Sequence, residues 1–392
     1  MRATTLVTAA IVMSGCAQGA AEPQQPAADV AASQRQTPAG NPPDAGAAPP
    51  GPGAVPPGAG VAPAGPCDPS IHPAVVIASS GRCAAILPAA ATCAADLVLC
   101  NGGSNQPAAA TSDGRGSVAL FCAGAGGGSR FGDLFVPMHG AFVSRMALGS
   151  DVRPLADGFV TPAEGASAPA FSWDFLAHDG SLRASQPAGF LLAGPNRAVL
   201  VGASGSALLA QSFAADGTPG TTTELGTLPA SAGRLMLGGA VDTSGAALVI
   251  WQLDGEPRAS ARWLSAGGAA ATPAFELQGW LDAIPAAAPL AGGGIALAAS
   301  AQGGSSAPQW RGIVAAGRTV EDPAPAWLAG RGSFFLLPGG KAMAFGSEIV
   351  APDGTTCGTV DLGAPLLGVG VDGTAITAQD ARTFRLYPQL FR

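Results

Sequence analysis

The stretch Phe213-Ala214-Ala215-Asp216-Gly217 decides the fold class, because it joins two β-prone runs through a tight turn. It follows the apolar run 207–210 and precedes three threonines at 221–223. An Asp-Gly pair between such runs is a strong signal of a β-hairpin, since glycine supplies the positive φ that the turn requires. The pattern recurs at Asp179-Gly180, Asp254-Gly255, Asp353-Gly354 and Asp372-Gly373. The sequence therefore predicts an all-β domain built from repeated hairpins.

The turn glycines recur at a regular spacing. Gly180, Gly217 and Gly255 are 37 and 38 residues apart, and Gly317 and Gly354 are again 37 apart. The interval from Gly255 to Gly317 is 62 residues, so we expect one longer or degenerate unit there. A period near 40 residues with several strands per unit is typical of the blades of a β-propeller.

The blade number follows from the length of the domain. Residues 67–392 number 326, which is 392 less the first 66. At roughly 45 residues per blade they predict a β-propeller of about seven blades, with about six or eight still open. The Phe-x-x-Asp-Gly-Thr hairpins resemble the divergent blade repeats of bacterial exported propeller proteins, over residues 170–380. Tandem β-sandwiches, which also contain many Asp-Gly hairpins, are the alternative fold.

The chain before this domain has a different composition. Residues 17–66 contain no Leu, Ile, Phe, Trp or Tyr and are dominated by Ala, Pro and Gly. Such a segment buries too little apolar surface to offset the entropy of ordering it. We therefore predict that residues 16–66 are a disordered tether and that 67–392 are the propeller-like domain, with a Cys-rich first part at 67–122.

The first 15 residues have the pattern of a signal peptide. Arg2 supplies a positive start and residues 3–13 form an apolar run, which is too short to span a hydrocarbon core of about 30 Å. Met13-Ser14-Gly15-Cys16 follows and resembles the lipobox of bacterial lipoproteins, although Met13 stands where that family usually has Leu.

The lipobox resemblance implies a lipid anchor. In that family the cysteine receives a diacylglyceryl group, the chain is cut before it, and the new amino terminus is acylated. Carried to this sequence, the lipidated residue is Cys16 and several acyl chains hold the protein at a membrane. Ala17 replaces the Asp that signals inner-membrane retention in the family, which favours the outer membrane over the inner.

Six cysteines remain after Cys16 is set aside. They are Cys67, Cys83, Cys93, Cys100, Cys122 and Cys357. An even number in an exported chain predicts three disulfides, and sequence alone leaves their pairing open. Since the first and last blades of a closed propeller are neighbours, a bond from Cys357 to Cys122 or to another early cysteine would latch the ring. No Cys-x-x-Cys or zinc spacing occurs, so no metal site is predicted.

The sequence carries no catalytic signature. Its three histidines, His72, His139 and His178, lie far apart, and neither a Gly-x-Ser-x-Gly elbow nor a phosphate-binding loop is present. Asp174 and Asp179 are weak carboxylate candidates beside Trp173 and Phe175, and Asp179 is also explained as a turn residue. The six tryptophans, Trp173, Trp251, Trp263, Trp280, Trp310 and Trp327, favour packing between blades over exposed recognition. No catalytic residue and no cofactor are predicted.

Charge and chemistry together favour a binding module. Lys341 is the only lysine and the formal net charge is −7, so the basic surface of a nucleic-acid binder is missing. We expect a lipid-anchored propeller that binds or scaffolds a protein or glycan partner at the cell envelope. An extracytoplasmic enzyme acting on polysaccharide or peptide is the alternative. Two carboxylates facing each other roughly 5 to 10 Å apart at the channel mouth would favour that enzyme.

Overall fold

The computed structural model describes residues 11–13, 74–77, 95–100, 105–124, 131–136, 141–144, 152–163, 172–229, 234–253, 256–281, 284–299 and 308–391. Apart from the short 3₁₀ turn η2 (Pro338–Gly340), the elements in these ranges are β-strands. No helix within them is long and apolar enough to cross a bilayer.

The described strands form seven sheets, which we number in chain order. Sheet 1 contains β4 (Asn105–Ser112), β5 (Val118–Gly124), β6 (Phe131–Val136) and β7 (Ala141–Ser144). Sheet 2 contains β8 (Arg153–Leu155), β9 (Gly158–Pro162), β10 (Trp173–Leu176) and β11 (Leu182–Gln186). Sheet 3 contains β12 (Phe190–Gly194), β13 (Arg197–Ser204), β14 (Ala207–Ala214) and β15 (Pro219–Thr227). Sheet 4 contains β16 (Leu235–Val241), β17 (Ala247–Leu253), β18 (Arg258–Leu264) and β19 (Phe275–Leu281).

The remaining sheets continue the same order. Sheet 5 contains β20 (Ala286–Pro289), β21 (Ile295–Ala299), β22 (Gln309–Val314) and β23 (Glu321–Pro323). Sheet 6 contains β24 (Phe335–Leu336), β25 (Met343–Phe345), β26 (Glu348–Val350) and β27 (Thr356–Asp361), and sheet 7 contains β28 (Leu366–Val369), β29 (Ala375–Ala378) and β30 (Thr383–Tyr387). Within each sheet neighbouring strands follow one another in sequence and pair antiparallel, as in a meander.

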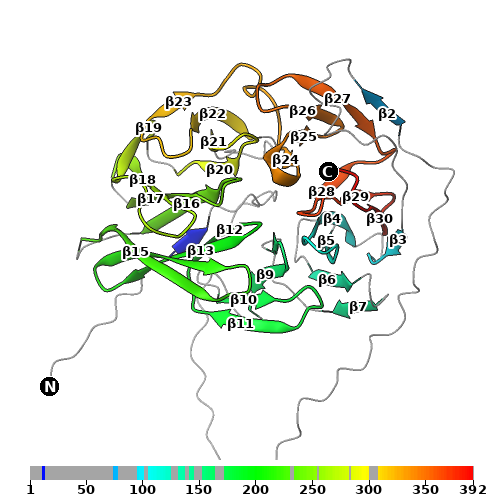
Figure 1. The fold of residues 1–392 in the computed structure, drawn as a ribbon, viewed down its shortest axis with the longest axis horizontal. Coiled ribbons are helices and arrows are strands. Elements are labelled where there is room, and N and C mark those ends of the chain that lie inside the picture. Colours follow the sequence, from blue (N-terminus) through cyan, green and yellow to red (C-terminus); the bar gives the residue numbers. More distant parts are fainter. Residues whose placement is uncertain are drawn as a thin grey trace, which may run out of the picture.

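The sheets stand around a central axis as the blades of a β-propeller (Figure 1). The ring closes because each sheet shares a buried apolar cluster with the next, and sheet 7 shares one with sheet 1. The all-β propeller expectation is thereby confirmed, and the tandem sandwiches are excluded. Alternating strand residues face the two neighbouring sheets, so the core is a set of layers between blades.

Three strands from the N-terminal part of the chain complete these sheets. β3 (Ala95–Val98) pairs with β30 as the outermost strand of sheet 7, and β2 (Ala74–Ile77) adds a fifth strand to sheet 6 beside β27. β1 (Ile11–Met13), which lies in the predicted signal peptide, pairs in parallel with β16. Sheet 7 is therefore built from both ends of the domain.

The predicted Asp-Gly hairpins are confirmed at four of the five positions: Gly180, Gly217, Gly354 and Gly373 each follow a tight turn with φ between 82° and 85°. Asp254-Gly255 lies outside the described residues. The longer or degenerate unit expected between Gly255 and Gly317 was a misassignment. Gly268 (φ 91°) lies in the β18–β19 turn of sheet 4, which is equivalent to the β14–β15 turn that contains Gly217 in sheet 3. The turn of sheet 4 reads Ser-Ala-Gly-Gly in place of Asp-Gly, so the sequence signal was absent there.

Backbone hydrogen bonds join the inner turns of neighbouring sheets. The amide of Val371 donates to the Ser112 carbonyl (3.0 Å), that of Gly114 to Leu155 (3.1 Å), and that of Ala156 to Pro195 (2.5 Å). These bonds connect sheet 7 to sheet 1, sheet 1 to sheet 2, and sheet 2 to sheet 3. The inner turns of sheets 7, 1, 2 and 3 are therefore linked in a row by backbone hydrogen bonds on one face of the ring.

Candidate functional site

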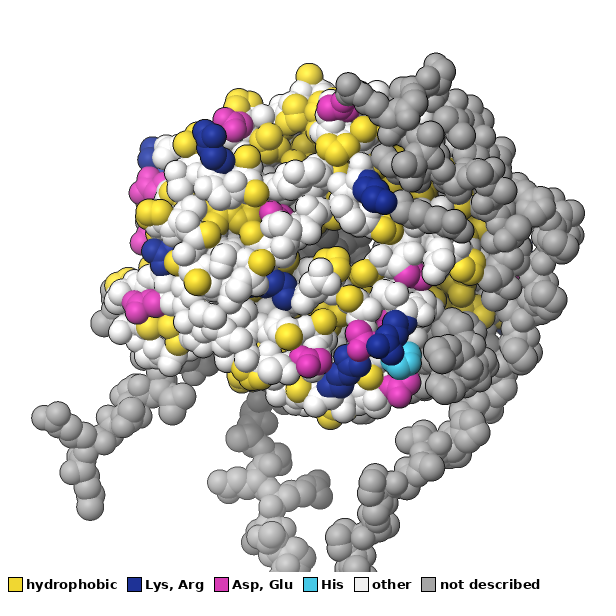
Figure 2. Space-filling model, viewed as in Figure 1, with side chains coloured by type: hydrophobic (Ala, Val, Ile, Leu, Met, Phe, Trp, Pro, Cys, Tyr) yellow, Lys and Arg dark blue, Asp and Glu magenta, His cyan; other side chains and the backbone are white. Residues whose placement is uncertain are grey.

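The described ionisable side chains gather most densely where the inner turns of sheets 7, 1 and 2 meet. Figure 2 shows basic, acidic and histidine side chains close together on one part of this face. We call this group the rim cluster, and it consists of Ser112, Asp113, Arg115, Asp157, His178, Arg183 and Asp372. His178 is the one histidine among the described residues, since His72 and His139 lie outside them.

Asp113 is the most deeply buried member of the rim cluster. It begins the β4–β5 turn, and its Oδ1 accepts hydrogen bonds from the amides of Arg115 and Ser117, both at 2.9 Å. Its Oδ2 is buried and has no hydrogen-bond partner. Burial raises the pKa of the Asp113 carboxyl to about 6; the two amide hydrogen bonds oppose that rise and the Asp372 charge adds to it.

Asp372 links sheet 7 to sheet 1. Its Oδ1 accepts hydrogen bonds from the Ser112 hydroxyl (2.6 Å) and from the Thr374 amide (3.0 Å), and its Oδ2 accepts one from the Thr374 hydroxyl (2.7 Å). This carboxylate thus caps its own turn and holds the neighbouring turn through one hydroxyl. It is engaged on both oxygens.

Asp157 organises the charges between sheets 1 and 2. Its Oδ2 accepts a hydrogen bond from Arg183 Nη2 (2.7 Å), and its Oδ1 lies 2.8 Å from Arg115 Nε. The Nδ1 atom of His178 lies 3.8 Å from the same Oδ1. Two guanidinium groups therefore bracket one carboxylate across the sheet junction.

A second turn repeats the geometry of Asp113. Asp242 begins the β16–β17 turn, is 1% exposed, and accepts hydrogen bonds at Oδ1 from the amides of Ser244 (2.8 Å) and Ala246 (2.9 Å). Its Oδ2 is also buried without a hydrogen-bond partner. Asp242 differs from Asp113 in its neighbour, the cationic Arg197. Burial lowers the pKa of the Arg197 guanidinium, and the charge of Asp242 raises it.

The two carboxylates considered from sequence do not lie in the rim cluster. Asp174 is buried in β10, the third strand from the axis, where its Oδ1 accepts a hydrogen bond from the Ser185 hydroxyl (2.6 Å). Asp179 caps the exposed β10–β11 turn, and hydrogen bonds from the hydroxyl and amide of Ser181 lower its pKa. The interpretation of Asp179 as a turn residue is correct.

Sequence reasoning missed Asp113 and Asp242. Both follow the pattern Asp-x-x-Gly, in which Asp opens the turn and Gly116 or Gly245 closes it with φ near 85°. Asp113 also stands directly before Gly114 and so matches the Asp-Gly pattern, although it was not among the hairpins predicted from sequence, whereas Asp242 is followed by Thr243. A search for Asp-x-x-Gly between apolar runs would have found both.

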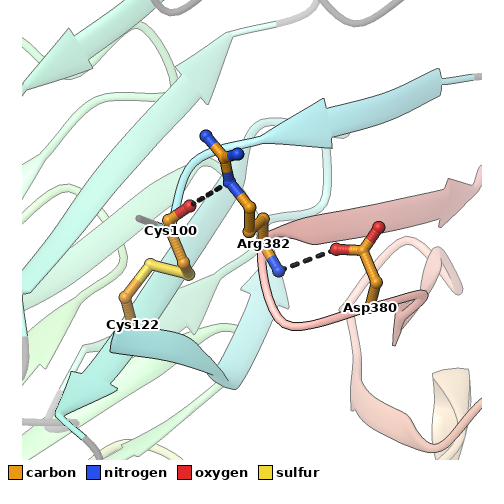
Figure 3. The surroundings of a disulfide bond; sticks show 4 residues. All are labelled: Cys100, Cys122, Asp380 and Arg382. Atoms are coloured by element: carbon orange, nitrogen blue, oxygen red, sulfur yellow. Dashed lines mark hydrogen bonds between the residues drawn. A yellow bond between two sulfur atoms is a disulfide. The ribbon is translucent and has the colours of Figure 1, made fainter. Parts of the chain in front are cut away.

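The described disulfide joins the last sheet to the first. Cys100 lies two residues after the end of β3 and bonds Cys122 of β5, with a Cα–Cα distance of 5.8 Å (Figure 3). Arg382 supports this connection, because its carbonyl accepts the amides of Leu99 and Cys100 and its Nε donates to the Cys100 carbonyl (3.4 Å). The disulfide thus fixes β3, the outermost strand of sheet 7, to sheet 1.

The hypothesis that Cys357 bonds Cys122 is therefore wrong. Cys122 instead bonds Cys100, because β3 brings that cysteine to the outer edge of sheet 7 beside β5, and the alternative of a bond from Cys357 to another early cysteine stays a prediction. Cys357 is also disulfide-bonded, and its partner lies outside the described residues. Cys16, Cys67, Cys83 and Cys93 lie outside them as well.

The tryptophan side chains pack between sheets, where their indole nitrogens donate hydrogen bonds. Trp173 of sheet 2 donates to the Gly189 carbonyl before sheet 3 (2.9 Å), Trp263 of sheet 4 to Arg318 of sheet 5 (3.0 Å), and Trp310 of sheet 5 to Gly332 before sheet 6 (3.1 Å). Each indole crosses to the next sheet, so these side chains fasten the ring.

The described inner strands bring no acidic side chain, histidine or cysteine to the axis, and Arg153 of β8 is their one charged residue. As the structure bounds them, β4, β8, β12, β16, β20, β24 and β28 contain no Asp, Glu, His or Cys residue. Across the described ranges, no group of three or more such side chains has an arrangement that could hold a metal ion. The chemistry near the axis is therefore confined to the rim cluster.

Comparison with known proteins finds distant likeness in structure. No family model matches the chain, and no curated protein matches it by sequence. The chain is similar to the Dos1 propeller (10% identity, TM-score 0.40), covering 78% of this chain and 96% of that one.

Two other solved structures are also similar. They are hydrazine synthase of Kuenenia stuttgartiensis (10%, TM-score 0.41, covering 74% and 97%) and TolB from Acinetobacter baumannii (12%, TM-score 0.31, covering 72% and 64%). The propeller assignment rests on the strand pairings described above.

Proposed function

We propose that this protein is a lipid-anchored lipoprotein whose propeller, one blade per sheet and seven in all, binds or scaffolds a protein or glycan partner at the cell envelope. The observation that carries the binding role is the composition of the inner strands. Runs such as Phe190–Gly194 and Leu235–Val241 present apolar or small residues without acid or base groups. A channel of this kind supports a scaffold, whereas a hydrolase needs a pair of reactive groups there.

The lipid anchor is proposed from the lipobox-like residues 13–16. Acyl chains on Cys16 would hold the protein at a membrane, with the outer membrane favoured over the inner because Ala17 is not Asp. The disulfide between Cys100 and Cys122 supports an oxidising compartment, since such bonds are rare in reducing ones. Residues 16–66 would then space the propeller from the membrane.

The sequence offers a sharp test of the anchor. Lys341, which is exposed, is the only lysine of the chain, so an acylated amino terminus leaves one primary amine in the mature protein. Amine-reactive labelling of the purified, detergent-extracted protein should add one label per chain, and Lys341→Arg should add none. Cys16→Ser should abolish partition into the detergent phase. A wild-type chain that stays in the aqueous phase and accepts two labels would exclude the anchor.

The binding role is tested by comparing two ring states. The full-length protein in detergent should retain a partner from its own envelope under chemical crosslinking, and the Cys100→Ser, Cys122→Ser double variant should retain less because its ring is less firmly closed. Equal retention by both, or by a variant unfolded with urea, would argue that the capture does not depend on the propeller.

The second candidate function is that of an enzyme, and the Asp113 carboxyl is the observation that favours it. Asp113 has a raised pKa and lies near Asp372, and carboxyl pairs in different environments can divide acid and base roles. Its complete burial opposes contact with a substrate. Hydrolysis of envelope polysaccharide or peptide that is lost in Asp113→Asn and retained in Asp242→Asn would favour this candidate.

A further inference from the structure

Asp113 lies between two residues that bond to two different neighbouring sheets, so its side chain can influence two sheet junctions at once. The residue before it accepts the backbone hydrogen bond from sheet 7, through Ser112 and Val371. The residue after it donates the bond to sheet 2, through Gly114 and Leu155. Asp113 itself is 0% exposed. A change in its charge therefore acts on both contacts of sheet 1.

The charged groups around Asp113 come from each element packed against it. Asp372 faces it from the β28–β29 turn, and His178 interacts with it from the β10–β11 turn. Arg115, on the same turn, is already engaged with Asp157 of the β8–β9 turn. No cation contacts Asp113 Oδ2, which has no hydrogen-bond partner of any kind.

We propose that Asp113 is a proton-operated latch, which tightens the contacts of sheet 1 with sheets 7 and 2 when it is protonated and loosens them when it is ionised. Ionisation leaves a negative charge on a buried oxygen without a donor and places it near a second carboxylate. Both conditions are costly in a low-dielectric interior. Protonation removes that cost and leaves Oδ1 free to accept the two turn amides. This regulation is separate from the proposed binding role and from the lipid anchor.

The sign of the pH effect follows from linkage. The carboxyl has a folded pKa of about 6 and an unfolded value of 3.8, so the folded state binds the proton more tightly. Stability therefore falls as the pH rises from about 4 to about 6 and changes no further above that range. From these two values the Asp113 contribution to the unfolding equilibrium constant differs by about tenfold between pH 5 and pH 8.

The test uses a matched pair of variants of the full chain. Asp113→Asn keeps the shape and the acceptor oxygen but cannot ionise, and Asp242→Asn makes the same change at the equivalent turn beside Arg197. Urea unfolding at pH 5 and pH 8 gives a ratio of unfolding constants for each protein. We expect the ratio for Asp113→Asn to be about tenfold smaller than for the wild type, and the ratio for Asp242→Asn to equal the wild-type ratio within about twofold.

Two outcomes of this test overturn the latch. One is a wild-type ratio retained in Asp113→Asn, and the other is an equal reduction in both variants, which would make the effect a general property of turn aspartates. Hydrogen exchange on the unaltered protein covers the case in which Asp113→Asn does not fold. The amides of Gly114 and Val371 should show higher protection factors at pH 5 than at pH 8, and equal factors would contradict the proposal.

Discussion

The junction between sheets 3 and 4 and the junction between sheets 7 and 1 hold the same kind of ring by different means. The first rests on a cluster of fifteen buried apolar residues that includes Leu208, Leu237 and Trp251, and Arg197 of sheet 3 adds hydrogen bonds to the carbonyls of Ser265 and Ala266. The second, which we call the closure junction, has ten buried residues and adds the Cys100–Cys122 disulfide. It also contains an ion pair in which both Asp96 oxygens accept hydrogen bonds from Arg385 (2.6 and 2.7 Å).

The difference between these two junctions indicates which part of the ring needs bonds in addition to apolar packing. Sheets 3 and 4 follow each other directly in the chain, and apolar packing together with side-chain hydrogen bonds such as those of Arg197 keeps them in contact. Sheet 7 must instead capture β3, a segment 289 residues away in sequence from Arg385. Closing such a long loop costs chain entropy, which the two-point ion pair with Arg385 helps to offset, while the disulfide fixes β3 to sheet 1 across a separation of 22 residues. The closure junction therefore replaces part of the apolar contact with specific bonds.

The largest effect is expected from breaking the apolar junction. Trp251→Ala should lower the free energy of unfolding by about 4 kcal/mol, because a large side chain that is only 8% exposed leaves a cavity between sheets 3 and 4. Urea unfolding followed by circular dichroism measures it. Leu182→Ala, at a residue 54% exposed, is the control and should change stability by less than about 0.5 kcal/mol. A Trp251→Ala loss of the same small size would show that this junction is not held by packing.

Removing the disulfide should cost somewhat less. The bond spans a separation of 22 residues, for which loop-closure entropy predicts about 3 kcal/mol. The Cys100→Ser, Cys122→Ser double variant should show that loss in non-reducing urea unfolding. If the loss exceeds that of Trp251→Ala, the closure junction depends on its covalent bond more than the comparison implies.

Breaking the ion pair should have a smaller effect. Arg385→Met keeps the apolar stem beside β3 but leaves the partly exposed Asp96 without its guanidinium, which we expect to cost about 2 kcal/mol. The measurement is the same unfolding experiment at low and at high salt. Because Arg385 is largely buried, the loss should persist in 1 M salt; a loss confined to low salt would indicate a surface pair.

The smallest expected effect is spectroscopic. Tyr387 is the only tyrosine, its hydroxyl donates to the Leu362 carbonyl (3.3 Å), and burial raises its pKa above the ordinary value of 10.0. The folded state thus favours the neutral phenol, so its contribution to stability is complete below pH 10 and is lost as the pH rises further. Tyrosinate absorbance should titrate later in the folded protein than in urea. Tyr387→Phe, as control, should lack the signal, and coincident curves would contradict the burial.

Much of the ring was predictable from sequence, but its closure was not. The Asp-Gly turns at Gly180, Gly217 and Gly354 report local backbone geometry, which four or five residues determine by themselves. The pairing of β3 with β30 depends on residues at opposite ends of the domain. No pattern within Ala95–Val98 identifies the strand with which it pairs. The same reason explains why Cys357 was matched to Cys122.

The candidate site was predictable only in part. Asp179 and Asp372 were visible as turn residues, whereas the role of Asp372 in holding Ser112 requires the ring to bring sheet 7 against sheet 1. Asp113 differs from Asp242 only through its neighbours, Asp372 in one case and Arg197 in the other. Local sequence describes the turn, and the long-range arrangement determines the electrostatics.

The pairing of β3 with β30 also determines when, during synthesis of the chain, the protein can reach its native fold. A strand from the beginning of the domain stays without its partner until residues 383–387 have been made, so an incomplete chain presents an open β-edge. Loss of the last ten residues would leave a molecule prone to aggregation, and folding should be slow and cooperative.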